Sequence, residues 1–97
     1  MSKTLSGKFI DLVDIMDKLR KECPWDKEQT HESLRKYIIE EAYEVVETID
    51  NENWEDLEEE LGDLLLQVVF QSAIAREAGK FSIESVIEIL NKKLIIS

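Results

Sequence analysis

Acidic side chains that could bind a metal ion concentrate between residues 40 and 63. This stretch holds 12 of the 22 Asp and Glu residues and no Lys or Arg. Within it, Glu41 and Glu44 stand three residues apart, and so do Glu60 and Asp63. Residues with this spacing share one face of a helix. Such carboxylates either form a solvated charged surface or, where they meet, offer the hard oxygen ligands that Mg²⁺, Mn²⁺ and Ca²⁺ prefer.

Two predicted helices carry these acids. Apolar residues at helical spacing predict one helix over about residues 30–50 and another over about 54–77. At 100° per residue, Glu41 lies about 60° from the centre of the first apolar stripe, and Glu60 lies about 40° from Leu64. Both acids therefore flank buried faces. Packed antiparallel, the two helices bring together four carboxylates, those of Glu41, Glu44, Glu60 and Asp63.

Four neighbouring carboxylates repel one another strongly. Two of them about 5 Å apart repel by roughly 3 kcal/mol at an effective dielectric constant near 20. A whole domain is stable by only about 5–15 kcal/mol. The cluster must therefore hold protons, stay apart in water or bind a cation. We expect a site for a hard divalent cation.

The remaining segments are also predicted to be helical, which makes the chain an all-α protein with one domain over residues 1–97. A first helix over about 7–21 ends before Pro24, because proline disfavours helical geometry at the residue that precedes it. The helix of residues 30–50 is expected to start near Thr30, after a short capping turn. The residues of that turn are Asp26 and Gln29.

Capping residues mark the other helix ends. Asn53 is expected to cap the third helix, and Gly79 is expected to end it. Ser82 then caps a last helix, with Phe81 and Val86 packed around it as a hydrophobic staple.

Composition narrows the class of protein. The chain has 97 residues and a formal net charge of −10, which argues against nucleic-acid and anionic-membrane partners because these need basic patches. No apolar run approaches the length of a membrane span. A single cysteine, Cys23, rules out an internal disulfide and fits the cytoplasm. Because so short a chain builds only a modest core, oligomerisation is expected.

The same residues resemble a known family. Glu40-Glu41-Ala42-Tyr43-Glu44 with Glu60-Leu61-Gly62-Asp63 looks like the E-E-x-x-E and E-x-x-D signature of the all-α nucleoside triphosphate pyrophosphohydrolases. The segment Cys23-Pro24-Trp25-Asp26 is more specifically like the MazG branch. It favours that branch over the dUTP, dCTP and phosphoribosyl-ATP pyrophosphohydrolases, which share the acidic signature. The resemblance covers about residues 9–94.

The resemblance implies a fold, a reaction and a metal. The fold is a four-to-five-helix unit that completes a helical bundle as a homodimer, sometimes as a dimer of dimers. The reaction is hydrolysis of a nucleoside triphosphate to a monophosphate and pyrophosphate, with Mg²⁺ as cofactor and Mn²⁺ as an alternative. The implied metal ligands are Glu41, Glu44, Glu60 and Asp63.

Other residues are candidates for catalysis or substrate binding. Glu41 and Glu40 are the catalytic candidates, although Glu40 points away from the apolar stripe and fits a surface role equally well. Trp25 either stacks on a nucleobase or anchors its loop. His31 is expected to be a surface or capping residue, and Gln67 either supports a metal ligand or is a buried core amide. The candidate phosphate contacts, which are otherwise solvated cations, are Lys27, Arg35 and Lys93.

One departure from the family keeps an alternative open. Family members usually follow the lysine of the last helix with an Arg pair, whereas no arginine follows Lys93 here. A non-catalytic module that keeps the metal site and binds a nucleotide or a protein partner therefore remains an alternative. A purely structural acidic bundle is a third, and it predicts no response to Mg²⁺.

Overall fold

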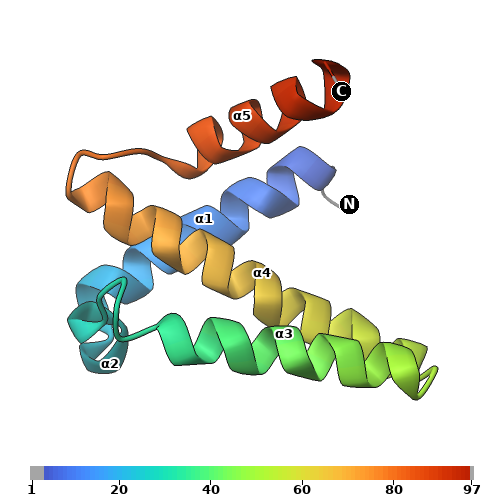
Figure 1. The fold of residues 1–97 in the computed structure, drawn as a ribbon. Helices are drawn as coiled ribbons and strands as arrows, with labels where there is room; N and C mark the ends of the chain where they lie inside the picture. Colours follow the sequence, from blue (N-terminus) through green and yellow to red (C-terminus); the bar gives the residue numbers. More distant parts are fainter. Residues whose placement is uncertain (1–3, 97) are drawn as a thin grey trace.

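Helices are the only regular secondary structure in the part of the chain that the structure describes (Figure 1). This structure is a computed structural model of residues 4–96, without the side chain of Ile96. The predicted all-α class is therefore confirmed. Among these residues no helix is long and apolar enough to cross a membrane. The helices are α1 (Leu5–Glu22), α2 (Pro24–Glu28), α3 (Arg35–Asp50), α4 (Trp54–Glu77) and α5 (Ile83–Ile96).

Local capping explains where α4 begins and ends, as the sequence predicted. The Asn53 side chain accepts a hydrogen bond from the backbone N–H of Asp56. At the other end, Gly79 has a φ of 69°, and the N–H of Lys80 donates to the carbonyl of Ala75. This is a Schellman motif, which needs a left-handed residue at the position that Gly79 holds.

The hydroxyl groups of Ser82 and Ser85 hydrogen-bond reciprocally to each other's backbone N–H before α5. This confirms Ser82 as the cap of that helix. The turn between α3 and α4 holds the one non-glycine residue with positive φ among the described residues, Glu52 at 53°.

The segment before α3 differs from the prediction. Pro24 starts a short helix, α2, because proline suits the first helical turn, where no N–H donor is needed. Regular helix α3 then begins only at Arg35. Thr30 and Ser33 exchange side chain to backbone hydrogen bonds and hold a turn between the two helices. The expected capping by Asp26 and Gln29 was wrong, since the Gln29 amide donates to the carbonyl of Trp25.

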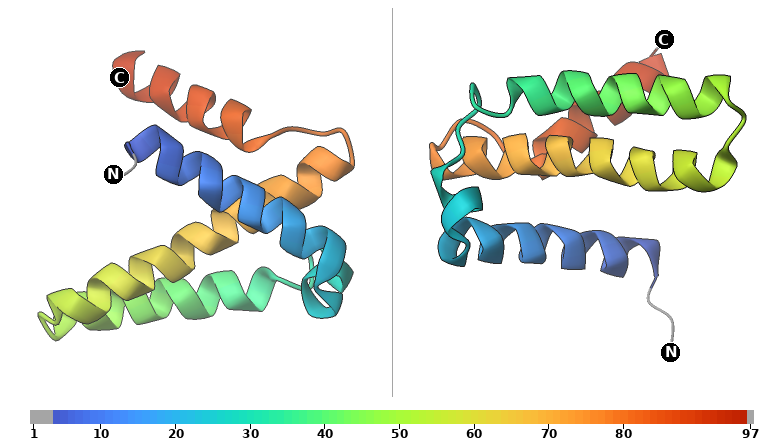
Figure 2. Two further views of the ribbon diagram at one scale, coloured as in Figure 1. Left: turned by 180° about the vertical axis from the view of Figure 1, so that it is seen from behind. Right: turned by 90° about the horizontal axis from the view of Figure 1, so that it is seen from below.

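Helix α4 is the centre of the fold. Helix α3 runs antiparallel along one side of it, α1 crosses on the opposite side, and α5 contacts α4 alone among the described helices (Figure 2). The buried core lies where α1, α4 and the turn before α3 meet. It consists of Met16, Leu34, Val69, Phe70 and Ala73.

An arginine that the sequence analysis did not single out ties α2 to the end of α4. Arg20 donates two hydrogen bonds of 2.8 Å to the carboxylate of Glu77. Its third nitrogen donates to the backbone carbonyls of Asp26 and Gln29, at 2.6 and 3.0 Å. The Arg20 side chain is only 10% exposed. It thereby fixes the position of α2, the helix that carries Trp25.

Candidate metal centre

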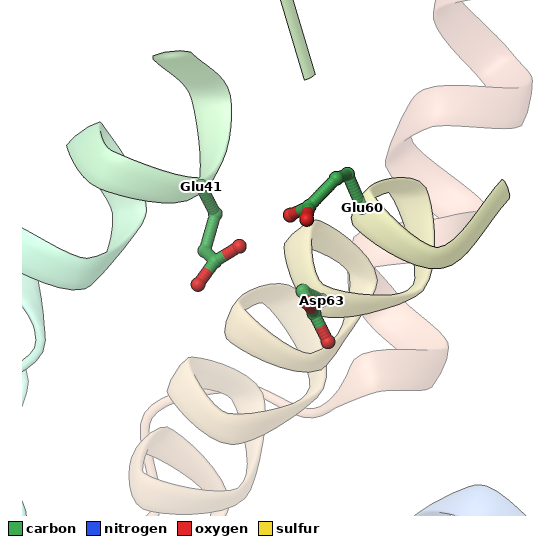
Figure 3. A group of neighbouring side chains, drawn as sticks. All are labelled: Glu41, Glu60 and Asp63. Carbon is green, nitrogen blue, oxygen red and sulfur yellow. The ribbon is translucent and has the colours of Figure 1, made fainter. Parts of the chain in front are cut away.

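Three carboxylates meet between α3 and α4. Glu41 reaches from α3 toward Glu60 and Asp63 on α4 (Figure 3). One oxygen from each of the three lies within 4.8 Å of the others. The antiparallel packing of the two helices produces this meeting, because Glu60 and Asp63 lie almost one turn apart on the face of α4 that is turned to α3.

Two of the oxygens are buried without a hydrogen-bond partner. One oxygen of Glu41 and one of Glu60 have neither solvent contact nor a partner among the described residues. A buried polar atom without a partner is costly, and a buried charge is costlier. The arrangement is therefore incomplete as a purely structural feature. A hard divalent cation would satisfy both oxygens at once, so the residues fit such an ion.

The close approach of these carboxyl groups raises the pKa of two of them. A hydrogen bond with the Glu44 carboxyl group, together with burial, raises the pKa of Glu60 to about 7, and the charges of Glu44, Asp63 and Glu41 add to this. The pKa of Glu41 is also raised, first by burial and then by the charges of Glu44 and Asp63. Without a cation, Glu60 thus keeps its proton to a higher pH than an ordinary carboxyl group does.

The structure places the fourth predicted ligand at the edge of this group. Glu44 is exposed to solvent and interacts with Glu60, whereas the close group of three consists of Glu41, Glu60 and Asp63. Glu40 is exposed, as its position on the helical wheel indicated.

The candidate substrate contacts do not touch the acidic group. Trp25 is half-exposed and packs edge-on against the rings of Tyr37 and Phe70, with centroids 5.8 and 6.3 Å away. Lys27 and Arg35 are exposed, and among the described residues neither forms an ion pair with the three acids. Lys93 lies in the last turn of α5, a helix that contacts α4 but not α3, which carries Glu41.

The two remaining polar candidates are His31, in the turn before α3, and Gln67, on α4. His31 is partly buried, and its ring nitrogen Nδ1 hydrogen-bonds to the side-chain oxygen of Gln71. The Gln71 amide in turn donates to the His31 backbone carbonyl. His31 therefore anchors the turn before α3 to α4, a role that sequence spacing could not show across 40 residues. Gln67 is buried.

Comparison with known proteins agrees with the motif resemblance. A sequence profile of the MazG nucleotide pyrophosphohydrolase domain matches residues 29–96. The nucleoside triphosphate pyrophosphohydrolase/pyrophosphatase MazG of Thermotoga maritima is 60% identical over 89 residues, which are 90% of this chain and 35% of that protein. A nucleoside triphosphate pyrophosphohydrolase of Mycobacterium tuberculosis is 47% identical over 89 residues, which are 90% of this chain and 27% of that protein. The chain thus spans about a third or less of the length of these relatives.

A solved structure shares the fold. The crystal structure of a mazG-related protein from Thermotoga maritima matches with a TM-score of 0.76 at 28% sequence identity, over 87% of this chain and 74% of that one. Since the profile also covers both acidic motifs and most of the chain, the chain belongs to the MazG nucleotide pyrophosphohydrolase domain family.

Proposed function

We propose that this domain hydrolyses nucleoside triphosphates to nucleoside monophosphate and pyrophosphate, using Mg²⁺ or Mn²⁺. The observation that carries this proposal is the group of three carboxylates with two buried, unpartnered oxygens in a MazG domain. Glu41, Glu60 and Asp63 would hold the ion. Glu44, next to Glu60, is the fourth candidate ligand. When bound, the ion neutralises phosphate oxygens and lowers the pKa of water.

The residues of the chain then have distinct tasks. The oxygen of a water molecule forms a bond to the α-phosphorus, and the bond to the bridging oxygen breaks, so that pyrophosphate leaves with the electron pair. A carboxylate near the water accepts its proton. Glu41, which lies within the group, is the first candidate for this carboxylate. Glu40 is exposed and could assist only from outside the group.

Charge dictates how the substrate arrives. With a net charge of −10, the domain repels a free nucleoside triphosphate, so we expect the substrate to bind as its magnesium complex. Phosphate contacts from Lys27, Arg35 or Lys93 would add to this attraction. Trp25, held in place by its aromatic neighbours, offers its exposed face to the substrate.

The experiment measures pyrophosphate release from each ribo- and deoxyribonucleoside triphosphate, with and without Mg²⁺. The wild type should release pyrophosphate only with the ion, and Glu41→Gln should lose at least 100-fold in rate. Glu58→Gln, an exposed change on α4, is the matched control and should keep the wild-type rate. If the folded wild type binds Mg²⁺ but releases no pyrophosphate, the non-catalytic module is the better account.

We also propose that the domain works as a homodimer or a dimer of dimers. Its accessible surface is 7555 Å², whereas a folded monomer of this mass exposes about 5,700 Å². Its radius of gyration is 14.8 Å, against about 13 Å for a compact domain of 100 residues.

Helix α3 adds a stripe of exposed apolar residues at helical spacing. They are Ile39 (71% exposed), Tyr43 (68%) and Val46 (53%). A second copy of the chain that packed against such faces would bury the accessible surface that this chain exposes beyond that of a compact monomer.

A further inference from the structure

Helix α2, which carries Trp25 and Lys27, has no core of its own to hold it in place. It is five residues long, and none of them is buried. A helix of this length does not persist in water by itself. Among the described helices, only α1 comes close to its backbone. The position of α2 relative to α3 and α4 therefore depends on side-chain contacts.

Arg20 on α1 supplies the contacts that reach from α2 to α4. Its guanidinium group donates to both carboxylate oxygens of Glu77, the last residue of α4, at 2.8 Å each. From its other edge it donates to the backbone carbonyls of Asp26 and Gln29, at 2.6 and 3.0 Å. These carbonyls lie at the C-terminal end of α2, where a cationic side chain interacts favourably with a helix. One planar cation thus ties α2 to the end of α4.

Two aromatic contacts place Trp25 on the side of the fold where the acidic group lies. The indole ring packs edge-on against Tyr37 of α3 and Phe70 of α4. On α3, Tyr37 stands about one turn before Glu41. On α4, Phe70 stands about two turns after Asp63. Residues at these spacings share a helix face, so the ring of Trp25 lies on the same side of the α3–α4 pair as these two acids.

We propose that Arg20 is a positioning residue for substrate binding, which holds α2 so that Trp25 and Lys27 can contact a triphosphate bound at the acidic group. The inference rests on the proposed function, because only there are these two residues substrate contacts. Arg20 itself does not need to touch the substrate, since its side chain is only 10% exposed and bonds within the protein. A guanidinium group donates from two edges of one plane, whereas a lysine ammonium donates from a single point. Lysine in its place therefore cannot bridge Glu77 and the α2 carbonyls.

The first test measures KM and kcat for pyrophosphate release with Mg²⁺ from the triphosphate that the wild type hydrolyses best. In Arg20→Lys we expect KM to rise about tenfold and kcat to stay within about threefold, because α2 contributes to binding while the acidic group is untouched. Arg76→Lys makes the same chemical change in the exposed ion pair with Asp17 and should leave both constants unchanged. If Arg20→Lys lowers only the melting temperature, or lowers kcat at an unchanged KM, the proposal is overturned.

Two further variants keep the proposal testable if Arg20→Lys does not fold. Glu77→Gln keeps a hydrogen-bond acceptor but removes its charge, so it should raise KM in the same direction by a smaller factor. Trp25→Ala should raise KM as well, and Glu77→Gln should then add less than it does in the wild type, because both changes act through α2. An unchanged KM in Glu77→Gln, or full additivity of the two changes, would contradict the proposal.

The fluorescence of Trp25 gives a readout that needs no turnover. The chain has two tryptophans, so Trp54→Phe, a change at an exposed residue, leaves Trp25 as the only one. In this background, acrylamide should quench Trp25 more strongly after Arg20→Lys but not after Arg76→Lys. The same signal measures binding of the α,β-methylene analogues of ATP, CTP, GTP and UTP, which cannot release pyrophosphate. Their affinity should fall about tenfold in Arg20→Lys.

These measurements separate the inference from the proposed reaction. If the wild type releases pyrophosphate, and Arg20→Lys changes neither KM nor the affinity for the analogues, the inference fails while the proposed function stands. If no triphosphate is hydrolysed, the proposed function fails, and weaker binding of an analogue in Arg20→Lys alone would still support the positioning role. A wild type that neither hydrolyses a triphosphate nor binds an analogue would overturn both.

Discussion

At the scale of single residues, the acidic group is a set of like charges that none of the ion pairs among the described residues neutralises. Sequence periodicity predicted that Glu41, Glu60 and Asp63 meet, because each flanks an apolar stripe on a helix that must pack. It could not predict that Glu44 lies at the edge, since that depends on how the two helices are rotated against each other. The role of Arg20 could not be predicted from the sequence, because its partner Glu77 is 57 residues away.

The raised pKa of Glu60 sets a pH dependence of stability. Its pKa is about 7 in the fold against an ordinary value of 4.5, so the native state binds a proton that the unfolded chain releases. The resulting stabilisation is fully present below about pH 4.5 and is lost as pH rises through 7. Glu41 acts in the same direction. In EDTA, the melting temperature followed by circular dichroism should fall between pH 5 and 8.

Two variants distinguish the contribution of Glu60 to this pH dependence from that of the other carboxyl groups. Glu60→Gln should flatten the decline, whereas Glu58→Gln, exposed on the same helix, should leave it unchanged. If the melting temperature of the wild type changes with pH in the same way as that of Glu60→Gln, Glu60 is not protonated in the fold.

At the scale of the elements, helix ends that depend on neighbouring residues could be predicted, and the segment before α3 could not. Asn53, Gly79 and Ser82 act within a few residues of their own helix. The turn before Arg35, in contrast, is held by contacts with distant helices, those of Arg20 on α1 and Gln71 on α4. Sequence periodicity carries no information about such partners.

The tie made by Arg20 is expected to stabilise the fold. Arg20→Ala removes hydrogen bonds to the Glu77 carboxylate and to two backbone carbonyls, so it should lower the free energy of unfolding by about 2 kcal/mol. Arg76→Ala breaks an exposed pair with Asp17 at 3.1 Å and should cost about 0–1 kcal/mol. Urea denaturation measures both. Equal losses would contradict the assigned role of Arg20.

At the scale of the whole molecule, one chain leaves much apolar surface uncovered, which supports the proposed self-association. The composition predicted a helical domain that oligomerises, and the surplus surface of α3 and the sparse contacts of α5 support this expectation. The sequence could not predict which faces would pair between two copies. Helices α1, α3 and α5 all carry apolar stripes, and only their packing against α4 decides which stripes stay exposed.

The proposed self-association can be tested at the exposed apolar stripe of α3. Light scattering after size exclusion should give at least twice the protomer mass of 11.3 kDa. Val46→Glu places a charge in the exposed stripe of α3 and should shift the protein toward monomer. Ile10→Glu, on α1 at the opposite side of α4, serves as the control and should leave the mass unchanged. A wild type that is monomeric at all concentrations would contradict the proposed dimer.

The central claim is that Glu41, Glu60 and Asp63 together bind a divalent cation. Isothermal titration calorimetry of the chelator-treated protein with Mg²⁺ at pH 8 tests it most directly, because it needs no substrate and no turnover. The wild type and Glu58→Gln should bind Mg²⁺ alike, and both Glu60→Gln and Asp63→Asn should bind at least tenfold more weakly. Equal affinity in all four proteins, or no binding by the wild type, would contradict the metal centre.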